Sequence, residues 1–173
     1  DGAIAHGISP AYPDLNGTDY TTIIDQAAFD RLNATLADAK AHGATVINLA
    51  PDQQLDASRR KLAPHIVLGV TDEMVIMKEE IFGPLLPIKP YRDAEEVIAY
   101  VNSGDRPLAF YPFTNDKRLA ERYITHIISG SVGVNEAIMQ VGQHDISSIQ
   151  LAMLPPYGKR AELALKWMFK LRG

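Results

Sequence analysis

The sequence predicts an α/β fold in which helices flank a partly parallel β-sheet. Stretches with the apolar spacing of helices alternate with short β-rich runs along most of the chain, and this alternation is typical of α/β proteins. Glycine or proline marks many of the boundaries between these stretches, where regular structure is expected to break. No internal repeat or low-complexity tract interrupts the pattern.

The first half of the chain is predicted to form a lead-in, a helix and two strands. Residues 1–24 contain several glycines and prolines without periodicity, which predicts a loop or extended lead-in. Asp25 is the expected N-cap of the helix, and Gly43 its end, because glycine readily adopts the left-handed conformation. Residues 44–49 and 65–70 are predicted strands separated by a polar surface excursion. The even-numbered residues of the second strand are expected to share one face.

The second half is predicted to contain three further strands and two helices. A strand over residues 85–91 is expected to be irregular or at an edge, because Pro87 and Pro90 cannot donate ladder hydrogen bonds. Asp93-Ala94-Glu95-Glu96 has the pattern of a capping box and predicts a helix that ends at Ser103-Gly104. The other predicted elements are a strand over 108–113, a helix capped by Thr114 or Asn115 and closed by Gly130, and a strand over 131–135.

Composition indicates a water-soluble globular protein and excludes several functions. Of the 173 residues, 46% are hydrophobic and 22% are charged, as is usual for such proteins. A net charge of −4 and a pI of about 5.7 argue against nucleic-acid binding. Residues 1–6 do not have the pattern of a signal peptide, no apolar run reaches about 20 residues, and the first residue is not Met. We therefore expect a piece of a longer cytoplasmic protein.

The sequence offers no expected metal or disulfide site. Cysteine is absent, which excludes disulfides and thiolate ligands. The histidines show none of the spacings typical of metal ligands. They are His6, His42, His65, His126 and His144.

The stretch Met77-Lys78-Glu79-Glu80-Ile81-Phe82-Gly83-Pro84 resembles the Glu-Glu-(Ile/Val)-Phe-Gly-Pro motif of the aldehyde dehydrogenase superfamily. Residues 94–98, 108–111 and 130–135 follow it with a succession and spacing similar to that family. Residues 103–109, 134–136 and 155–159 are similar to the coniferyl aldehyde dehydrogenase branch. The resemblance covers the chain from about Tyr20 onward and implies the C-terminal part of the family's three-layer catalytic domain.

The resemblance implies that Glu80 and Phe82 bind the nicotinamide ribose of NAD or NADP. A carboxylate offers two acceptor oxygens to the two hydroxyl groups of a ribose, and an aromatic ring restricts where the nicotinamide lies. The Glu-Glu pair alone favours another interpretation, in which solvated charges flank a buried Phe82. The surrounding resemblance reverses this preference for Glu80. Glu79 and Lys78 are interpreted as structural or surface residues.

The resemblance also implies that this chain contains no catalytic residue. In the family, the nucleophilic cysteine, the general-base glutamate and the glycine-rich cofactor-binding turn lie N-terminal to the segment present here. After Asp145 the family continues with Pro-Phe-Gly-Gly, but here Ile146 follows. We therefore predict a sequence gap at 145/146, with a catalytic-domain portion over 1–145 and a tail over 146–173. The chain alone is expected to be inactive.

Two further regions have interpretations of their own. Asn135 is expected to satisfy loop backbone groups, since asparagine often does so. Residues 159–172 predict an amphipathic basic helix, which either docks on a membrane surface or packs against its own domain or a sister subunit. We favour packing.

Together these features predict the C-terminal portion of a coniferyl-aldehyde-dehydrogenase-like enzyme. By the resemblance, such an enzyme oxidises an aldehyde, here an aromatic one, to a carboxylic acid with NAD or NADP. A homodimer or larger homo-oligomer without nucleic acid is expected. The alternative is a non-catalytic assembly or interaction domain, which the absence of cysteine leaves open.

Overall fold

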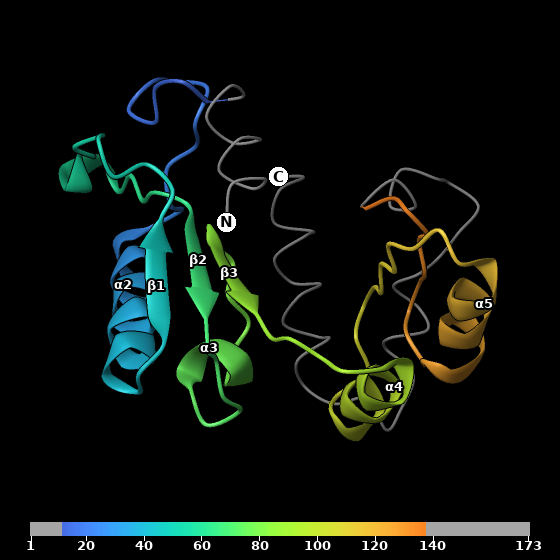
Figure 1. Cartoon of the computed structure of the whole chain (residues 1–173). Coiled ribbons are helices and arrows are strands. Elements are labelled where there is room, and N and C mark those ends of the chain that lie inside the picture. Colours follow the sequence, from blue (N-terminus) through green and yellow to red (C-terminus); the bar gives the residue numbers. More distant parts are fainter. Residues whose placement is uncertain (1–11, 138–173) are drawn as a thin grey trace. The chain divides into compact units, whose positions relative to one another are not determined.

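The computed structural model describes residues 12–137, which form two compact units (Figure 1). The first unit ends at Pro90 and the second begins at Tyr91. The first contains α2 (Gln26–Ala41), β1 (Thr45–Asn48), the 3-10 turn η1 (Ala57–Arg59), β2 (His65–Leu68), α3 (Val75–Lys78) and β3 (Leu85–Ile88). The second contains α4 (Ala94–Ser103) and α5 (Lys117–His126).

The three strands of the first unit form a mixed sheet in the order β1-β2-β3. β1 pairs with β2 antiparallel, and β2 pairs with β3 parallel with Val67 opposite Pro87. The partly parallel sheet and the edge position of β3 are as predicted for the described part of the chain. The proposed single buried face of β2 is wrong, because Ile66 and Val67 are both buried. β2 also ends earlier than expected, since Gly69 has a left-handed φ of 71°.

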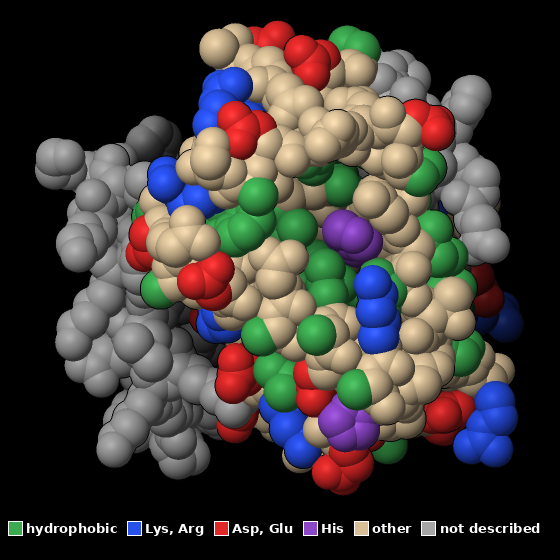
Figure 2. Space-filling model, turned by 90° about the vertical axis from the view of Figure 1, so that its left-hand side faces the viewer, with side chains coloured by type: hydrophobic (Ala, Val, Ile, Leu, Met, Phe, Trp, Pro, Cys, Tyr) green, Lys and Arg blue, Asp and Glu red, His purple; other side chains and the backbone are tan. Residues whose placement is uncertain are grey.

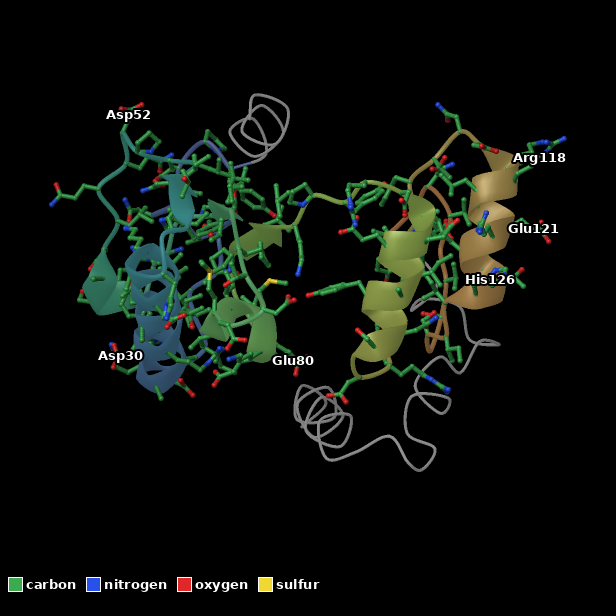
Figure 3. The ribbon with its side chains drawn as sticks, turned by 60° about the horizontal axis from the view of Figure 1, so that its bottom comes forward. Asp30, Asp52, Glu80, Arg118, Glu121 and His126 are labelled. Carbon is green, nitrogen blue, oxygen red and sulfur yellow. The ribbon has the colours of Figure 1, made fainter. Side chains whose placement is uncertain are left out.

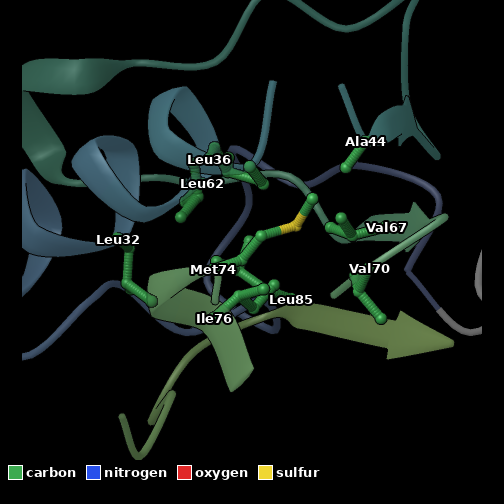
Figure 4. Packing of buried hydrophobic residues seen from close by; sticks show 10 residues of the cluster. Leu32, Leu36, Ala44, Leu62, Val67, Val70, Met74, Ile76 and Leu85 are labelled. Carbon is green, nitrogen blue, oxygen red and sulfur yellow. The ribbon is translucent and has the colours of Figure 1, made fainter. Parts of the chain in front are cut away.

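Helix α2 begins and ends as its sequence predicts. The Asp25 carboxylate accepts a hydrogen bond of 2.7 Å from the backbone N–H of Ala28, and Gly43 has a φ of 87°. Its apolar stripe packs into the core of the first unit (Figure 4). This core comprises Leu32, Leu36, Ala39, Ala44, Leu62, Val67, Val70, Met74, Ile76 and Leu85. Each large aliphatic side chain buried there contributes roughly 1.5–3 kcal/mol.

The polar stretch 51–63 is not entirely a surface excursion, because its end anchors the lead-in. Lys61 is only 3% exposed. Its Nζ donates to the carbonyl oxygen of Gly17 at 2.8 Å and also to that of Tyr20. The Tyr20 hydroxyl donates to the carbonyl oxygen of Leu62 at 2.7 Å, and burial raises the pKa of Tyr20 to about 12. Residues 17–20 of the lead-in are therefore held to the first unit by polar contacts.

In the second unit, α4 starts at its predicted cap and α5 does not. The Asp93 carboxylate accepts from the backbone N–H of Glu96 at 2.9 Å. The cap of α5 is Asp116, whose carboxylate accepts from the N–H groups of Arg118 and Leu119. Thr114 instead accepts from the N–H of Asp116 through its hydroxyl, so neither Thr114 nor Asn115 is the cap.

The end of α5 and the two strands predicted around it also differ from expectation. The helix ends at His126 rather than near Gly130, because Ile127 has extended backbone angles of −98° and 120°. The predicted strands over 108–113 and 131–135 shrink to one parallel bridge between Phe110 and Val132. Pro112, like Pro107 just before the first segment, cannot donate a ladder hydrogen bond.

Some predicted features fall outside residues 12–137. These are the junction at 145/146 and the amphipathic helix over 159–172. Among the described residues, no helix combines the length and apolar character that crossing a bilayer requires. On the face shown in Figure 2, acidic and basic side chains are interspersed rather than gathered by sign.

Candidate cofactor-binding site

The motif residues 79–84 form the connection between α3 and β3. Helix α3 has only four residues and was not predicted from the sequence. Its N-cap residue, Met74, makes no side-chain cap hydrogen bond. Instead, the N–H of Val75 donates to the carboxylate of Asp38 on α2 at 2.9 Å. A neighbouring helix thus completes the turn that leads into the motif.

Arg31 of α2 binds the backbone of the motif itself. Its Nη1 donates to the carbonyl oxygen of Glu80 at 3.1 Å, and its Nη2 donates to that of Ile81 at 2.7 Å. A guanidinium presents its N–H groups as a planar fork, so it can bind two neighbouring acceptors in a fixed geometry. Two consecutive peptide groups of the motif are therefore fixed relative to α2.

Phe82 has an unusual combination of backbone conformation and exposure. Its φ of 43° lies in the left-handed region, where a bulky residue is strained by about 1–3 kcal/mol. Its side chain is 59% exposed. The interpretation in which Phe82 is buried beside solvated glutamates is therefore wrong for Phe82. A large aromatic group on strained backbone is presented at the surface of the first unit.

Glu80 is exposed in the same loop, with α3 beside it (Figure 3). One residue, Ile81, separates it from Phe82, and Ile81 packs against the core. Of its neighbours, Glu79 is exposed, and Lys78 forms an ion pair of 3.2 Å with Glu73. The loop thus offers a carboxylate and an aromatic ring close together in the chain, and the surface interpretation of Lys78 fits its ion pair.

His65 lies where the motif joins the sheet. Its backbone N–H donates to the carbonyl oxygen of Pro84 at 2.8 Å, and its Nδ1 lies 2.8 Å from the carbonyl oxygen of Ala63. Burial lowers the pKa of His65, and the positive charge of Lys40 lowers it further. The ring is therefore neutral near pH 7, and its Nδ1 acts as the donor to Ala63.

Asn135 of the second unit has the structural role that its sequence suggests. Its Oδ1 accepts from the N–H of Thr114 at 2.8 Å, and its Nδ2 donates to the carbonyl oxygen of Thr114 at 3.0 Å. The side chain thus satisfies both backbone groups of one loop residue. Among residues 12–137, no group of three or more His, Asp or Glu side chains could hold a metal ion.

Sequence reasoning missed the two α2 residues that bind the motif segment. Arg31 and Asp38 lie seven positions apart, so they project from the same face of the helix, about two turns from each other. That spacing is the only signal in the sequence. It does not identify their partners, which lie 37 to 50 positions further along the chain.

The mixed sheet with flanking helices and the Glu-Glu-Ile-Phe-Gly-Pro loop define a portion of an α/β enzyme fold. The family model described as the aldehyde dehydrogenase family matches residues 7–147. The chain therefore belongs to the aldehyde dehydrogenase family, whose members are oxidoreductases that use NAD or NADP.

Individual relatives agree with this assignment. The chain is 45% identical over 137 residues to a coniferyl aldehyde dehydrogenase from Pseudomonas sp. (strain HR199 / DSM 7063), covering 78% of this chain and 28% of the relative. It is 39% identical over 142 residues to a probable coniferyl aldehyde dehydrogenase from Caulobacter vibrioides. This match covers 80% of this chain and 29% of the relative.

A solved structure agrees as well. The substrate-bound state of Staphylococcus aureus AldH matches with a TM-score of 0.73 and 27% identity, over 82% of this chain and 30% of that one. The chain thus spans less than a third of the length of these relatives.

Proposed function

We propose that this chain supplies one wall of the cofactor site of an aldehyde dehydrogenase, with Glu80 and Phe82 binding the nicotinamide ribose. The observation that carries the proposal is the motif loop, which exposes Phe82 on a left-handed backbone two residues after Glu80. The chemistry of this pair fits the ligand. A carboxylate accepts from both ribose hydroxyl groups, and an exposed ring provides an apolar surface for the nicotinamide.

The reaction that follows from this proposal is the oxidation of an aldehyde to a carboxylic acid. When bound, the nicotinamide ring supplies hydride-accepting chemistry. The residues of this chain bind and orient the ring, because a restrained ring spends more time in a reactive position. The similarity to coniferyl aldehyde dehydrogenases favours an aromatic aldehyde as substrate. We place the enzyme in the cytoplasm.

The chain on its own is proposed to be inactive towards aldehydes. It contains no cysteine and hence no thiolate, the nucleophile of covalent catalysis in this family. Incubating the purified chain with an aromatic aldehyde and NAD or NADP should produce no NADH or NADPH absorbance. Cofactor-dependent oxidation of the aldehyde by this chain would refute the proposal that the chain alone is inactive.

Two halves of the cofactor provide the direct test of binding. Titration of the isotope-labelled chain with nicotinamide mononucleotide should shift the NMR signals of amides 79–83, with a dissociation constant in the millimolar range. Adenosine monophosphate carries the same ribose hydroxyl groups but no nicotinamide, so it should shift these signals less, because it lacks the ring that Phe82 is proposed to contact. Equal responses to the two ligands, or no response to either, would contradict the assignment of Glu80 and Phe82.

Exposed apolar side chains favour a second candidate function, that of an assembly surface. Leu86 of β3 is 47% exposed, Ile124 of α5 is 49% exposed, and Ile128 is 56% exposed. Each unit thus has exposed apolar side chains of its own, and such groups can contribute to contacts with other protein surfaces, which in this case would be a homodimer or larger homo-oligomer. Sedimentation velocity distinguishes the candidates, since a monomer at high concentration would exclude assembly as the main function.

A further inference from the structure

Helix α2 binds the segment that carries the motif at two places, one before and one after α3. Asp38 accepts a hydrogen bond from Val75 at the start of α3, and Arg31 donates to the carbonyl groups of Glu80 and Ile81 after α3 ends. Both side chains project from one face of α2. Helix α2 therefore holds the backbone on both sides of α3.

The carbonyl groups that Arg31 binds immediately precede the strained residue. Phe82, at a φ of 43°, would gain free energy by relaxing to a negative φ, which would turn its ring in another direction. Such a conformation persists only when the surroundings restrain it. Arg31 restrains the peptide groups before Phe82, and Leu32 contacts Gly83 directly after it.

We infer that Arg31 is a positioning residue for the cofactor, acting through the backbone of the motif. Its guanidinium fork holds the Glu80 and Ile81 carbonyl groups, and thereby holds the Glu80 carboxylate and the Phe82 ring in the orientation that binds the nicotinamide ribose. The inference rests on the proposed function of Glu80 and Phe82. It assigns Arg31 no contact with the substrate or the cofactor.

Limited proteolysis of the full chain tests the restraint without any ligand. Chymotrypsin cleaves after exposed aromatic residues, and Phe113, which is 67% exposed, provides a reference site in the same molecule. Arg31→Met removes every side-chain donor but keeps an unbranched side chain with a similar helix propensity. It should raise cleavage after Phe82, relative to Phe113, by about tenfold or more, given the usual strength of hydrogen bonds to charged groups. An unchanged ratio would overturn the inference.

A second substitution separates geometry from charge. Arg31→Lys keeps the positive charge but replaces the planar fork with a single ammonium group. Its cleavage ratio should lie between those of the wild type and Arg31→Met. A ratio equal to that of the wild type would show that the positive charge alone restrains the loop, and that the planar fork is not needed. Arg118→Met, which alters an exposed arginine on α5 (Figure 3), is the matched control and should change nothing.

Ligand titration links the restraint to binding. Arg31→Met should weaken the response of amides 79–83 to nicotinamide mononucleotide about as strongly as Glu80→Gln, at a temperature where both variants remain folded. If Glu80→Gln abolishes the response and Arg31→Met leaves it intact, the role of Arg31 is wrong while the proposed function stands. If the wild type itself gives no response, the proposed function fails, and the proteolysis result still decides whether Arg31 restrains the loop.

Discussion

Gly83 lies so close to Leu32 that a Cβ at residue 83 would stand 2.5 Å from Leu32 Cδ1 and 2.6 Å from Cδ2. Leu32 is fully buried in the core beneath α2, so its methyl groups have little room to move. The glycine of the motif is therefore required for the close approach of the loop to α2. This contact lies next to Arg31 and directly after Phe82.

A double-mutant cycle tests this contact. Gly83→Ala should lower the free energy of unfolding by about 1–3 kcal/mol through overpacking. Leu32→Ala should lower it by about 2–5 kcal/mol by leaving a cavity. The double mutant should lose less than the sum, because the cavity accommodates the new methyl group. Denaturant unfolding measures all three variants.

Gly104→Ala is the control for this cycle. A Cβ there meets only the carbonyl oxygen of Val101 at an ordinary 3.9 Å, so stability should change by less than about 1 kcal/mol. If the losses of unfolding free energy for Leu32→Ala and Gly83→Ala simply add in the double mutant, the two side chains do not compete for the same volume.

The two adjacent glutamates of the motif allow a matched comparison. Glu80→Gln should weaken the binding of nicotinamide mononucleotide on the order of tenfold, because it removes charge-assisted hydrogen bonds to the ribose. Glu79→Gln makes the same chemical change one position away and should have little effect. Isothermal titration and thermal melting of both variants separate binding from folding. Equal losses would remove the special role of Glu80.

His65 should make stability depend on pH on the acidic side of neutrality. Burial lowers the pKa of His65 in the folded state, whereas an unfolded histidine titrates at about 6.5. Below that pH the unfolded chain binds more protons than the folded one, so stability falls as the pH drops through the folded-state pKa. Above about pH 6.5 the contribution of His65 is fully present.

Urea unfolding at a series of pH values checks this expectation. His65→Gln should flatten the decline in the free energy of unfolding between about pH 7 and about pH 5. His126→Gln, which replaces an exposed histidine on α5, provides the control variant. An identical pH profile for wild type and His65→Gln would contradict the assignment.

Asn135 should stabilise the loop that precedes α5. Asn135→Ala removes both hydrogen bonds to Thr114 and places a Cβ-only side chain at a φ of 57°, so a loss of about 1–3 kcal/mol is expected. Asn135→Asp retains the acceptor and should lose less. Equal stability of Asn135→Ala and wild type would show that the two bonds contribute nothing.

Local signals in the sequence predicted much of the fold. Asp25, Gly43 and Asp93 act within a few residues of their own helices, so their roles can be recognised without tertiary information. Helix α3 could not be predicted, because four residues carry no periodicity and its capping group, Asp38, is distant in the chain. The α5 cap was misplaced because Thr114, Asn115 and Asp116 are all good caps, and only the structure shows which carboxylate accepts.

The sequence proposes only part of the candidate site for a similar reason. Glu80 and Phe82 are candidates because they belong to a contiguous motif, which a sequence displays directly. The strain at Phe82 and the role of Arg31 depend on contacts between α2 and a loop about fifty residues away. No local pattern encodes such contacts.

The buried ammonium group of Lys61 limits how far this protein can be shortened. Its acceptors are the carbonyl groups of Gly17 and Tyr20, so a truncation that removes residues 12–20 would leave a cation inside the first unit without its oxygen partners. An unpaired buried charge destabilises a protein by several kcal/mol. Residues 17–20 therefore belong to the folded unit, and a shortened version of the protein should retain Gly17 and Tyr20.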